Sequence, residues 1–515
     1  MTVTPVRAAV VGLLAVCAVP FAAPTAGRGQ PPAAATPDDV KKLQNLGADA
    51  CRRCHREPQP EDVRDKVTDF VRLDEFTVWK NQDLHAKAFE VLSGPLGKQM
   101  GDALGWGDVS KRVECLACHA VNLSQELTAG VPRPARTPDE FYTKDGVGCE
   151  ACHGVADKWF RPHFDKSWRS ETPEKKLAAG ERDMRDPVAR ADRCASCHVG
   201  NWGEGKFVTH AMFAAGHPPL PPLESMTFSR DQPMHYIPPR DNKYFADLDA
   251  DAAWKLFHYR KGQSASARQM AVGAAAGFGT AMKTLAAAAE DARSGGLLDF
   301  ALFDCAACHH DLITPSWRQD RGFAGTPGRP QPRSGPTMLL KAVAGDEAGA
   351  FNSRFAALTK ACEAKPFGDP AAIAAAARDM AGWADGVAKS LGEANYPDAR
   401  VAKLRRDIAG AAGRKGPDYD NAQQLLWAVD ALKDENPAVP AKVAGELAKL
   451  GGLPGSDTPM IGPLWEKGKW EAGKRPLVAE TLSRRLGRYS LFEQNPDSFR
   501  RTFEKIAAEL GTSGQ

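Results

Sequence analysis

Cys149-Glu-Ala-Cys152-His153 is the stretch that determines how this sequence folds, because the same spacing of two cysteines and a histidine occurs five times. Twelve cysteines and twelve histidines in 515 residues predict only about 0.006 chance occurrences. Two thiols three residues apart lie on one side of a helical turn, and the following residue places an imidazole beside them. The other copies are Cys51-Arg-Arg-Cys54-His55, Cys115-Leu-Ala-Cys118-His119, Cys194-Ala-Ser-Cys197-His198 and Cys305-Ala-Ala-Cys308-His309.

This spacing is the signature of covalent haem c attachment. The two thiols form thioethers with two vinyl groups of one porphyrin, and the histidine is placed under the iron as its proximal ligand. Zinc sites and redox dithiols also use Cys-x-x-Cys pairs, but neither needs a histidine directly after every pair. The sequence therefore predicts five covalently attached haem c groups, with the proximal ligands His55, His119, His153, His198 and His309.

Seven histidines lie outside the motifs, and five irons need five further axial ligands. An all-histidine supply favours bis-His, low-spin, low-potential haems that transfer electrons. Helices are expected around His85 and His258, and helical spacing would put His210 and His217 on one side. His235, in a proline-rich loop, is the weakest candidate. The distal candidates are His85, His163, His210, His217, His258 and His310, and the haem that each would serve is left open.

The N-terminus has the form of a secretory signal. Arg7 precedes a short apolar run at 8–19, and small residues offer a cleavage site after Ala26. We therefore expect a signal peptide at 1–26, a flexible leader at 27–36 and a periplasmic or otherwise exported protein. The alternative is a lipoprotein anchored in the membrane through Cys17.

Length, charge and composition bound the organisation of the chain. The 67 basic and 64 acidic residues leave no basic excess, which argues against a nucleic-acid partner. The five motifs define a predicted pentahaem cytochrome c domain at 37–318. A Gly/Pro/Arg-rich linker is expected at 319–337, and a C-terminal helical domain at 338–512.

The expected fold class is mainly α, with little regular structure besides helices in the haem domain and a C-terminal helical bundle. Residues 262–303 are rich in Ala, Met and Leu and predict a long helix leading to the fifth motif. Cys362 lies on an apolar face and is expected to be a buried structural thiol. One face of residues 421–432 gathers Leu425, Leu426, Val429 and Leu432.

The order of the first four motifs resembles that of the cytochrome c-554 family. That family consists of tetrahaem carriers grouped with hydroxylamine oxidoreductase and pentahaem nitrite reductase. The similarity covers about 150 residues, from Cys51 to His198. It rests on the motifs and on Trp79, His85-Ala-Lys-Ala, Gly146-Val-Gly, His163 and Asp192-Arg.

The resemblance implies a mostly helical fold with haems in close stacked pairs. It also implies that His85 and His163 are distal ligands and that one haem lacks a sixth ligand, the candidate being that of Cys115, Cys118 and His119. The sequence departs from the family by having no histidine just before the fourth motif, where the segment of His210 and His217 is the candidate replacement. The fifth motif lies outside the resemblance, and no Cys-x-x-Cys-Lys motif is present.

Together these features predict an exported pentahaem cytochrome that relays electrons to redox partner proteins. The alternative is a reductase or oxidase of a small nitrogen or sulfur compound at one five-coordinate haem, so enzyme activity is left open. A third interpretation is a subunit of a membrane electron-transfer complex. The electron donor, the acceptor and the oligomeric state are not determined by the sequence.

Overall fold

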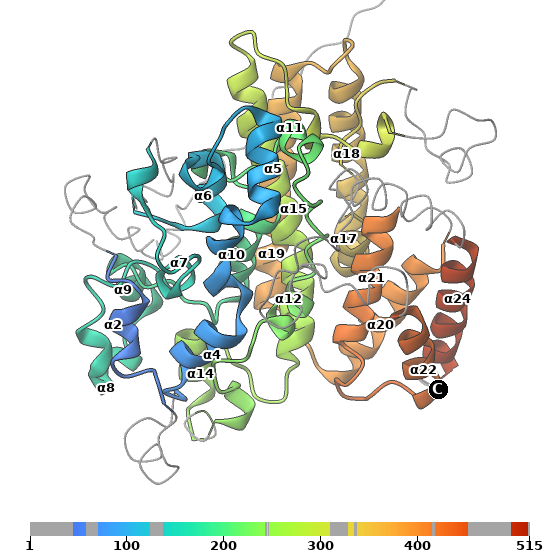
Figure 1. The fold of residues 1–515 in the computed structure, drawn as a ribbon. Helices are drawn as coiled ribbons and strands as arrows, with labels where there is room; N and C mark the ends of the chain where they lie inside the picture. Colours follow the sequence, from blue (N-terminus) through green and yellow to red (C-terminus); the bar gives the residue numbers. More distant parts are fainter. Residues whose placement is uncertain are drawn as a thin grey trace, which may run out of the picture. The chain divides into compact units, whose positions relative to one another are not determined.

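Short helices joined by loops form the part of the chain that carries the first four motifs (Figure 1). The computed structural model describes residues 45–57, 71–123, 137–242, 245, 247–309, 328–333, 337–414, 418–451 and 496–512. The predicted signal peptide and leader, Cys17, His310 and most of the predicted linker lie outside the described residues. The described chain is mainly α-helical, which confirms the expected fold class.

Capping residues and glycines set the ends of these short helices. Helix α10 (Pro187–His198) begins after Asp186, whose carboxylate accepts a hydrogen bond from the Val188 amide at 2.9 Å. Helix α5 (Pro95–Leu104) ends at Gly105, which has a left-handed φ of 65°. Two-residue strands β1 (Val121–Asn122) and β2 (Phe141–Tyr142) pair antiparallel, with Val121 opposite Tyr142.

The remaining elements up to the fifth motif are mostly one or two turns long. They are α2 (Ala48–Arg52), α4 (Glu75–Gln82), η1 (Leu84–Lys87), η2 (Glu90–Ser93), η3 (Val109–Lys111), α6 (Val113–His119), η4 (Pro138–Glu140), α7 (Cys149–His153), η5 (Pro162–Phe164), α8 (Lys166–Arg169), α9 (Pro173–Ala178), η6 (Trp202–Glu204), α11 (His210–Ala214), α12 (Ser225–Asp231), η7 (Pro239–Asp241), α14 (Ala250–Phe257), η8 (Phe300–Leu302) and η9 (Cys305–Ala307).

A long helix is present before the fifth motif, as predicted, but it is shorter than the expected 262–303: α15 covers Ala265–Ala292, and the chain turns at Gly295, whose φ is 105°. Ser264 caps the start of α15 by accepting a hydrogen bond from the Ala267 amide at 3.0 Å. Small side chains let neighbouring elements approach closely: a Cβ built on Gly273 would lie 1.8 Å from Ser225 Oγ of α12. Most residues of α15 are therefore buried.

Helix α15 lies in the hydrophobic core that also contains the C-terminal helices. Helix α19 (Pro370–Glu393) packs along α15. The ring of Phe278 on α15 lies 5.6 Å from that of Phe351 in α18 (Ala348–Glu363). Ala191 of α10 belongs to the same core, so the C-terminal helices pack on elements that precede the fifth motif. These helices are α17 (Thr337–Ala344), η10 (Gly345–Glu347), α18 (Ala348–Glu363), α19 (Pro370–Glu393), α20 (Asp398–Ala412), α21 (Tyr419–Ala431), α22 (Ala441–Gly451) and α24 (Pro496–Thr512).

Two expectations for the C-terminal part are confirmed. Cys362 is fully buried, and so is the apolar face of α21 and the residue after it, formed by Leu425, Leu426, Val429 and Leu432. In the part of the chain that the structure describes, no helix combines the length and the apolar character needed to cross a membrane.

Candidate functional site

Each of the five motifs occupies a single helical turn. Motifs 1 to 5 are numbered in chain order and begin at Cys51, Cys115, Cys149, Cys194 and Cys305. Motif 3 forms the whole of α7, and motifs 2 and 4 form the C-terminal turns of α6 and α10. Motif 1 begins in α2 and motif 5 in η9. After motif 3 the chain turns at Gly154, whose φ is +85°, and a Cβ there would lie 1.9 Å from the carbonyl oxygen of Gly180. This glycine lets the chain pass close to its neighbour directly after His153.

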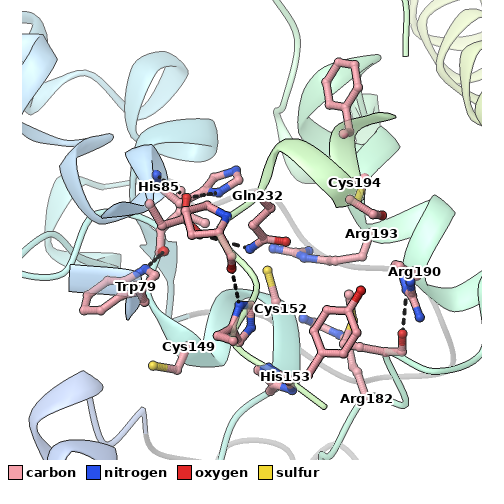
Figure 2. A pocket seen from close by; sticks show the side chains of 18 of the residues that line it. Trp79, His85, Cys149, Cys152, His153, Arg182, Arg190, Arg193, Cys194 and Gln232 are labelled. Carbon is pink, nitrogen blue, oxygen red and sulfur yellow. Dashed lines mark hydrogen bonds and ion pairs between the residues drawn. The ribbon is translucent and has the colours of Figure 1, made fainter. Parts of the chain in front are cut away.

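The first four motifs line one cavity of about 2200 Å³. A site for a single small ligand usually measures roughly 300–1,000 Å³, so this cavity has room for several groups of that size. Figure 2 shows Cys149, Cys152 and His153 of motif 3 in the same pocket as Cys194 of motif 4. The side chains of four attachment sites therefore face a shared interior.

Four motif histidines lie opposite a second histidine at nearly the same distance. The four separations between ring centroids range from 6.1 to 6.4 Å, and the rings are either close to parallel or close to perpendicular. The pairs are His55 with His163 (6.3 Å, 19°), His153 with His235 (6.4 Å, 83°), His198 with His85 (6.1 Å, 88°) and His309 with His210 (6.1 Å, 22°).

This separation fits one iron held between two imidazoles. An iron that binds one nitrogen on each side, at about 2 Å each, separates the two nitrogens by about 4 Å. Each ring centroid lies about 1 Å behind its nitrogen, so the centroids should be about 6 Å apart. The residues present therefore fit the axial ligand set of a haem iron at four motifs.

His119 of motif 2 has a different environment. His217 lies close enough for the charge of His119 to contribute to its lowered pKa, although burial is the larger cause and brings that pKa to about 4. Among the described residues, the two rings make no contact of the kind seen in the four pairs. His217 thus neighbours motif 2 without the close pairing found elsewhere.

The hydrogen bonds of these histidines identify the nitrogen that is free for a metal. Carboxylate and carbonyl oxygens only accept, so a ring whose Nδ1 lies beside one carries its proton on Nδ1 and leaves Nε2 to bind iron. The Nδ1 contacts are His55 with Glu75 Oε2 (2.8 Å), His85 with Asp83 Oδ1 (2.9 Å), His119 with the Ala88 carbonyl (2.6 Å), His163 with that of Phe160 (2.5 Å), His217 with that of Pro218 (2.8 Å) and His235 with that of Pro233 (3.1 Å).

Burial also keeps several of these rings in the neutral form that ligates metals. It lowers the pKa of His153 and of His198 to about 4, with the neighbouring histidines His235 and His85 as the next causes. Both rings are therefore neutral at pH 7, with a nitrogen lone pair available.

His258 has a different environment from the paired histidines. Its Nε2 lies 3.5 Å from Asp183 Oδ2, so this nitrogen faces a carboxylate at ion-pair distance. Its ring contacts Trp254 and lies opposite none of the five motif histidines in the described chain. The expected helix is also incorrect at this position, because His258 is the C-cap of α14 and has a φ of 52°.

Two further helical expectations differ from the structure. His85 lies in the short 3-10 helix η1, which begins after the capping carboxylate of Asp83. Helix α11 covers only His210–Ala214, so His217 lies beyond its end and the two histidines do not share a helical face. The helix stops because Gly216 has a φ of 113° and Pro218 disfavours helical backbone at the residue before it.

His235 is the residue that the sequence analysis ranked last, yet it lies opposite His153. Its proline-rich surroundings suggested a loop, which is correct. The position of the His235 ring depends on packing against residues distant in the sequence, such as His153, and a local sequence pattern does not predict such packing. The one signal in the sequence was the histidine count: with only seven histidines outside the motifs for five sites, His235 was also available as a ligand.

Thiols of different motifs also meet. The thiols of Cys51 in motif 1 and Cys149 in motif 3 lie close enough to shift each other's pKa in opposite directions, and so do those of Cys118 in motif 2 and Cys197 in motif 4. Burial, followed by the neighbouring Cys152 thiol, raises the pKa of Cys194 to about 12, so motifs 3 and 4 are neighbours too. The attachment sites are therefore linked in the order 1, 3, 4, 2.

A buried carboxylate locks motif 1 against motif 3. Glu150 lies inside motif 3, and its oxygens accept hydrogen bonds from the amides of Leu46 at 3.1 Å, Gly47 at 2.8 Å and Ala156 at 2.8 Å. The Leu46 and Gly47 amides lie directly before α2, which begins motif 1. The Glu150 side chain of motif 3 thus holds the residues that directly precede α2, the helix in which motif 1 begins.

The zinc interpretation finds no support in the described residues. No group of three or more His, Cys, Asp or Glu side chains there is arranged to hold a single metal ion. A zinc site of the Cys₄ or Cys₂His₂ type would require such a group.

Comparisons with known proteins identify the class of the N-terminal motifs. Residues 50–154 match the family model described as cytochrome c554 and c-prime. Cytochrome c-554 of Nitrosomonas europaea is 31% identical over 132 residues, which are 24% of this chain and 50% of that protein. The chain thus spans about half the length of this curated relative, and no solved structure matches it. The resemblance to the cytochrome c-554 family is confirmed for this segment.

Proposed function

We propose that the protein is an exported electron-transfer protein that carries five covalently attached haem c groups. The observation that carries the proposal is the repeated separation of 6.1–6.4 Å between a motif histidine and a second histidine. When bound, haem iron supplies a one-electron redox couple, and two imidazole ligands keep it low-spin. The predicted signal peptide supports export to the periplasm, and redox proteins are the partners.

Each haem is assigned its own residues. The thioether bonds are formed by Cys51 and Cys54, Cys115 and Cys118, Cys149 and Cys152, Cys194 and Cys197, and Cys305 and Cys308. The proposed axial pairs are His55 with His163, His119 with His217, His153 with His235, His198 with His85, and His309 with His210. His258 is left out because its Nε2 faces Asp183 and its ring lies opposite none of the five motif histidines in the described chain.

Counting the haems and their spin states tests the proposal. We expect the purified holoprotein to contain five haems by pyridine haemochrome assay and mass spectrometry. The EPR spectrum of the ferric protein should show low-spin signals for at least four of them, because two imidazoles give a strong ligand field. Fewer than five attached haems, or more than one high-spin haem, would contradict the assignment.

Two of the histidine ligands donate to carboxylates, and this predicts an effect on potential. A carboxylate acceptor makes an imidazole a more basic ligand and stabilises ferric iron. Replacing Asp83, beside His85, with Asn is therefore expected to raise the midpoint potential of one haem, and Glu75→Gln, beside His55, should raise that of another.

Spectroelectrochemical titration measures these potentials. Asp369→Asn is the matched control, because Asp369 caps α19, where its carboxylate accepts hydrogen bonds from the Ala371 and Ala372 amides and pairs with Lys365. A shift of either haem to lower potential would contradict the predicted role of the carboxylates.

A second candidate function follows from the looser arrangement at motif 2. If His217 leaves the iron beside His119 open, this site could bind a small nitrogen or sulfur compound and the protein would be a reductase or oxidase. The absence of ring contact between these two histidines in the described chain favours this alternative at motif 2 over the other sites. A high-spin EPR signal worth one haem, together with turnover of nitrite, hydroxylamine or tetrathionate, would support it. Five low-spin haems and no turnover would exclude it.

A further inference from the structure

The attachment sites of the first four motifs form a row with motif 1 at one end. Glu150 of motif 3 accepts hydrogen bonds from the Leu46 and Gly47 amides that precede motif 1. The Val147 amide, just before motif 3, donates to the His85 carbonyl at 3.0 Å, and the His85 ring lies opposite His198 of motif 4. Ala88, three residues after His85, accepts a hydrogen bond from His119 Nδ1 of motif 2 at 2.6 Å. Motif 2 is therefore the other end of this row of four. The position of motif 5 decides whether the row stops there.

Helix α11 connects motif 2 with motif 5. His210 at its start is stacked opposite His309 of motif 5, and His217, just past its end, lines the same cavity as His119 of motif 2, which contributes to the lowered pKa of His217. One helical turn and three further residues span at most about 17 Å between the two Cα atoms, even if those three were fully extended. Motif 5 therefore continues the row beyond motif 2.

Contacts of α11 fix this link on both sides. Met212 and Ala215 pack against Met100 of α5, the helix that precedes motif 2 (Figure 1). On the other side, Asp299 accepts hydrogen bonds from the His210 amide at 2.9 Å and from the Ala301 amide at 2.8 Å. Asp299 thereby joins the start of α11 to η8, the turn that leads into motif 5.

Exposure distinguishes the ends of the row from its interior. Cys54 of motif 1 and both cysteines of motif 5, Cys305 and Cys308, are exposed, and so is His309. The thiols of motifs 2, 3 and 4 are only partly exposed. The two terminal attachment sites are therefore the ones with thiols open to solvent.

We infer that the motif-5 site is a second port, at which electrons enter or leave the protein at the end of the row opposite motif 1. This inference rests on the proposed function. At the port, a one-electron donor protein loses one electron and the ferric site gains it, without a bond being formed or broken. The protein would then exchange electrons with one partner at the motif-1 end and with another at the motif-5 end. It would not use a single site for both partners.

A photosensitiser placed at either end tests the inference. A ruthenium polypyridyl label attached at Leu297→Cys, where the native side chain is 75% exposed, lies near motif 5 in the sequence. The matched label at Asp49→Cys, where the native side chain is 52% exposed, lies in α2 just before motif 1. Both variants also carry His163→Gly, which should make the motif-1 haem high-spin and give its reduction a distinct absorbance change.

The expected result depends on which end is labelled. With the label at position 297, Cys305→Ala combined with Cys308→Ala should abolish the fast reduction of the high-spin reporter. With the label at position 49, the same pair of substitutions should leave that reduction unchanged. If the fast phase at position 297 survives the loss of motif 5, the inference is overturned.

Haem counting separates this outcome from a failure of the proposed function. The parent protein should contain five haems and the motif-5 variant four, with unchanged low-spin signals from motifs 3 and 4. If the parent already lacks a haem on motif 5, the proposed function fails at that site. If five haems are present and the reporter responds equally to both labels without motif 5, only the port is excluded.

Discussion

Replacing His235 with Gly is expected to convert one haem in five from low-spin to high-spin. The ring of His235 lies 6.4 Å from that of His153, the separation expected for two ligands of one iron. Among the described residues, no histidine other than His235 lies opposite His153 in this way. Removing the imidazole leaves the motif-3 iron with one axial ligand and a weaker field. EPR of the ferric protein measures the change, and added imidazole should restore the low-spin signal.

His258→Gly is the control for this experiment, because local sequence favoured His258 and ranked His235 last. The Nε2 of His258 faces the carboxylate of Asp183 and not a motif histidine, so loss of this ring should leave all low-spin signals unchanged. A high-spin signal in the His258 variant, with none in the His235 variant, would show that the pairing at motif 3 is wrong. Rescue by imidazole in either variant would identify the vacant axial position.

The second large effect is expected at Glu150. Its carboxylate accepts three backbone hydrogen bonds, and two of the donors precede motif 1. Replacement by Ala leaves these amides without their acceptor, at a cost of about 1–3 kcal/mol for each amide that water does not reach. We expect the free energy of unfolding to fall by about 3 kcal/mol or more, as measured by denaturant unfolding of the holoprotein.

Two further variants make this prediction specific. Glu150→Gln keeps a carbonyl acceptor and should lose less stability than the alanine variant. Glu290→Ala removes a surface carboxylate that is paired with Arg293 and Arg378, and exposed pairs of this kind contribute roughly 0–1 kcal/mol. Equal losses for Glu150→Ala and Glu290→Ala would show that the link between motifs 1 and 3 adds little stability.

The helical content was largely predictable from the sequence, because it depends on local propensity and on periodic burial. The alanine-rich segment forms α15, and the apolar face of Leu425, Leu426 and Val429 is buried as expected. Local reasoning was less successful at helix ends. It did not foresee that α11 stops before His217 or that His258 adopts a left-handed conformation after α14.

The sequence by itself determined where haem can be attached, because the two thiols and the proximal histidine lie within one helical turn and need no distant residue. It also determined how many histidines are available as further ligands. Only the tertiary structure decided which of them lies opposite which motif, since each pair joins residues far apart in the chain. His235 and His258 illustrate the reason: the better local sequence belongs to His258, but packing turns its Nε2 toward Asp183 and brings His235 to His153.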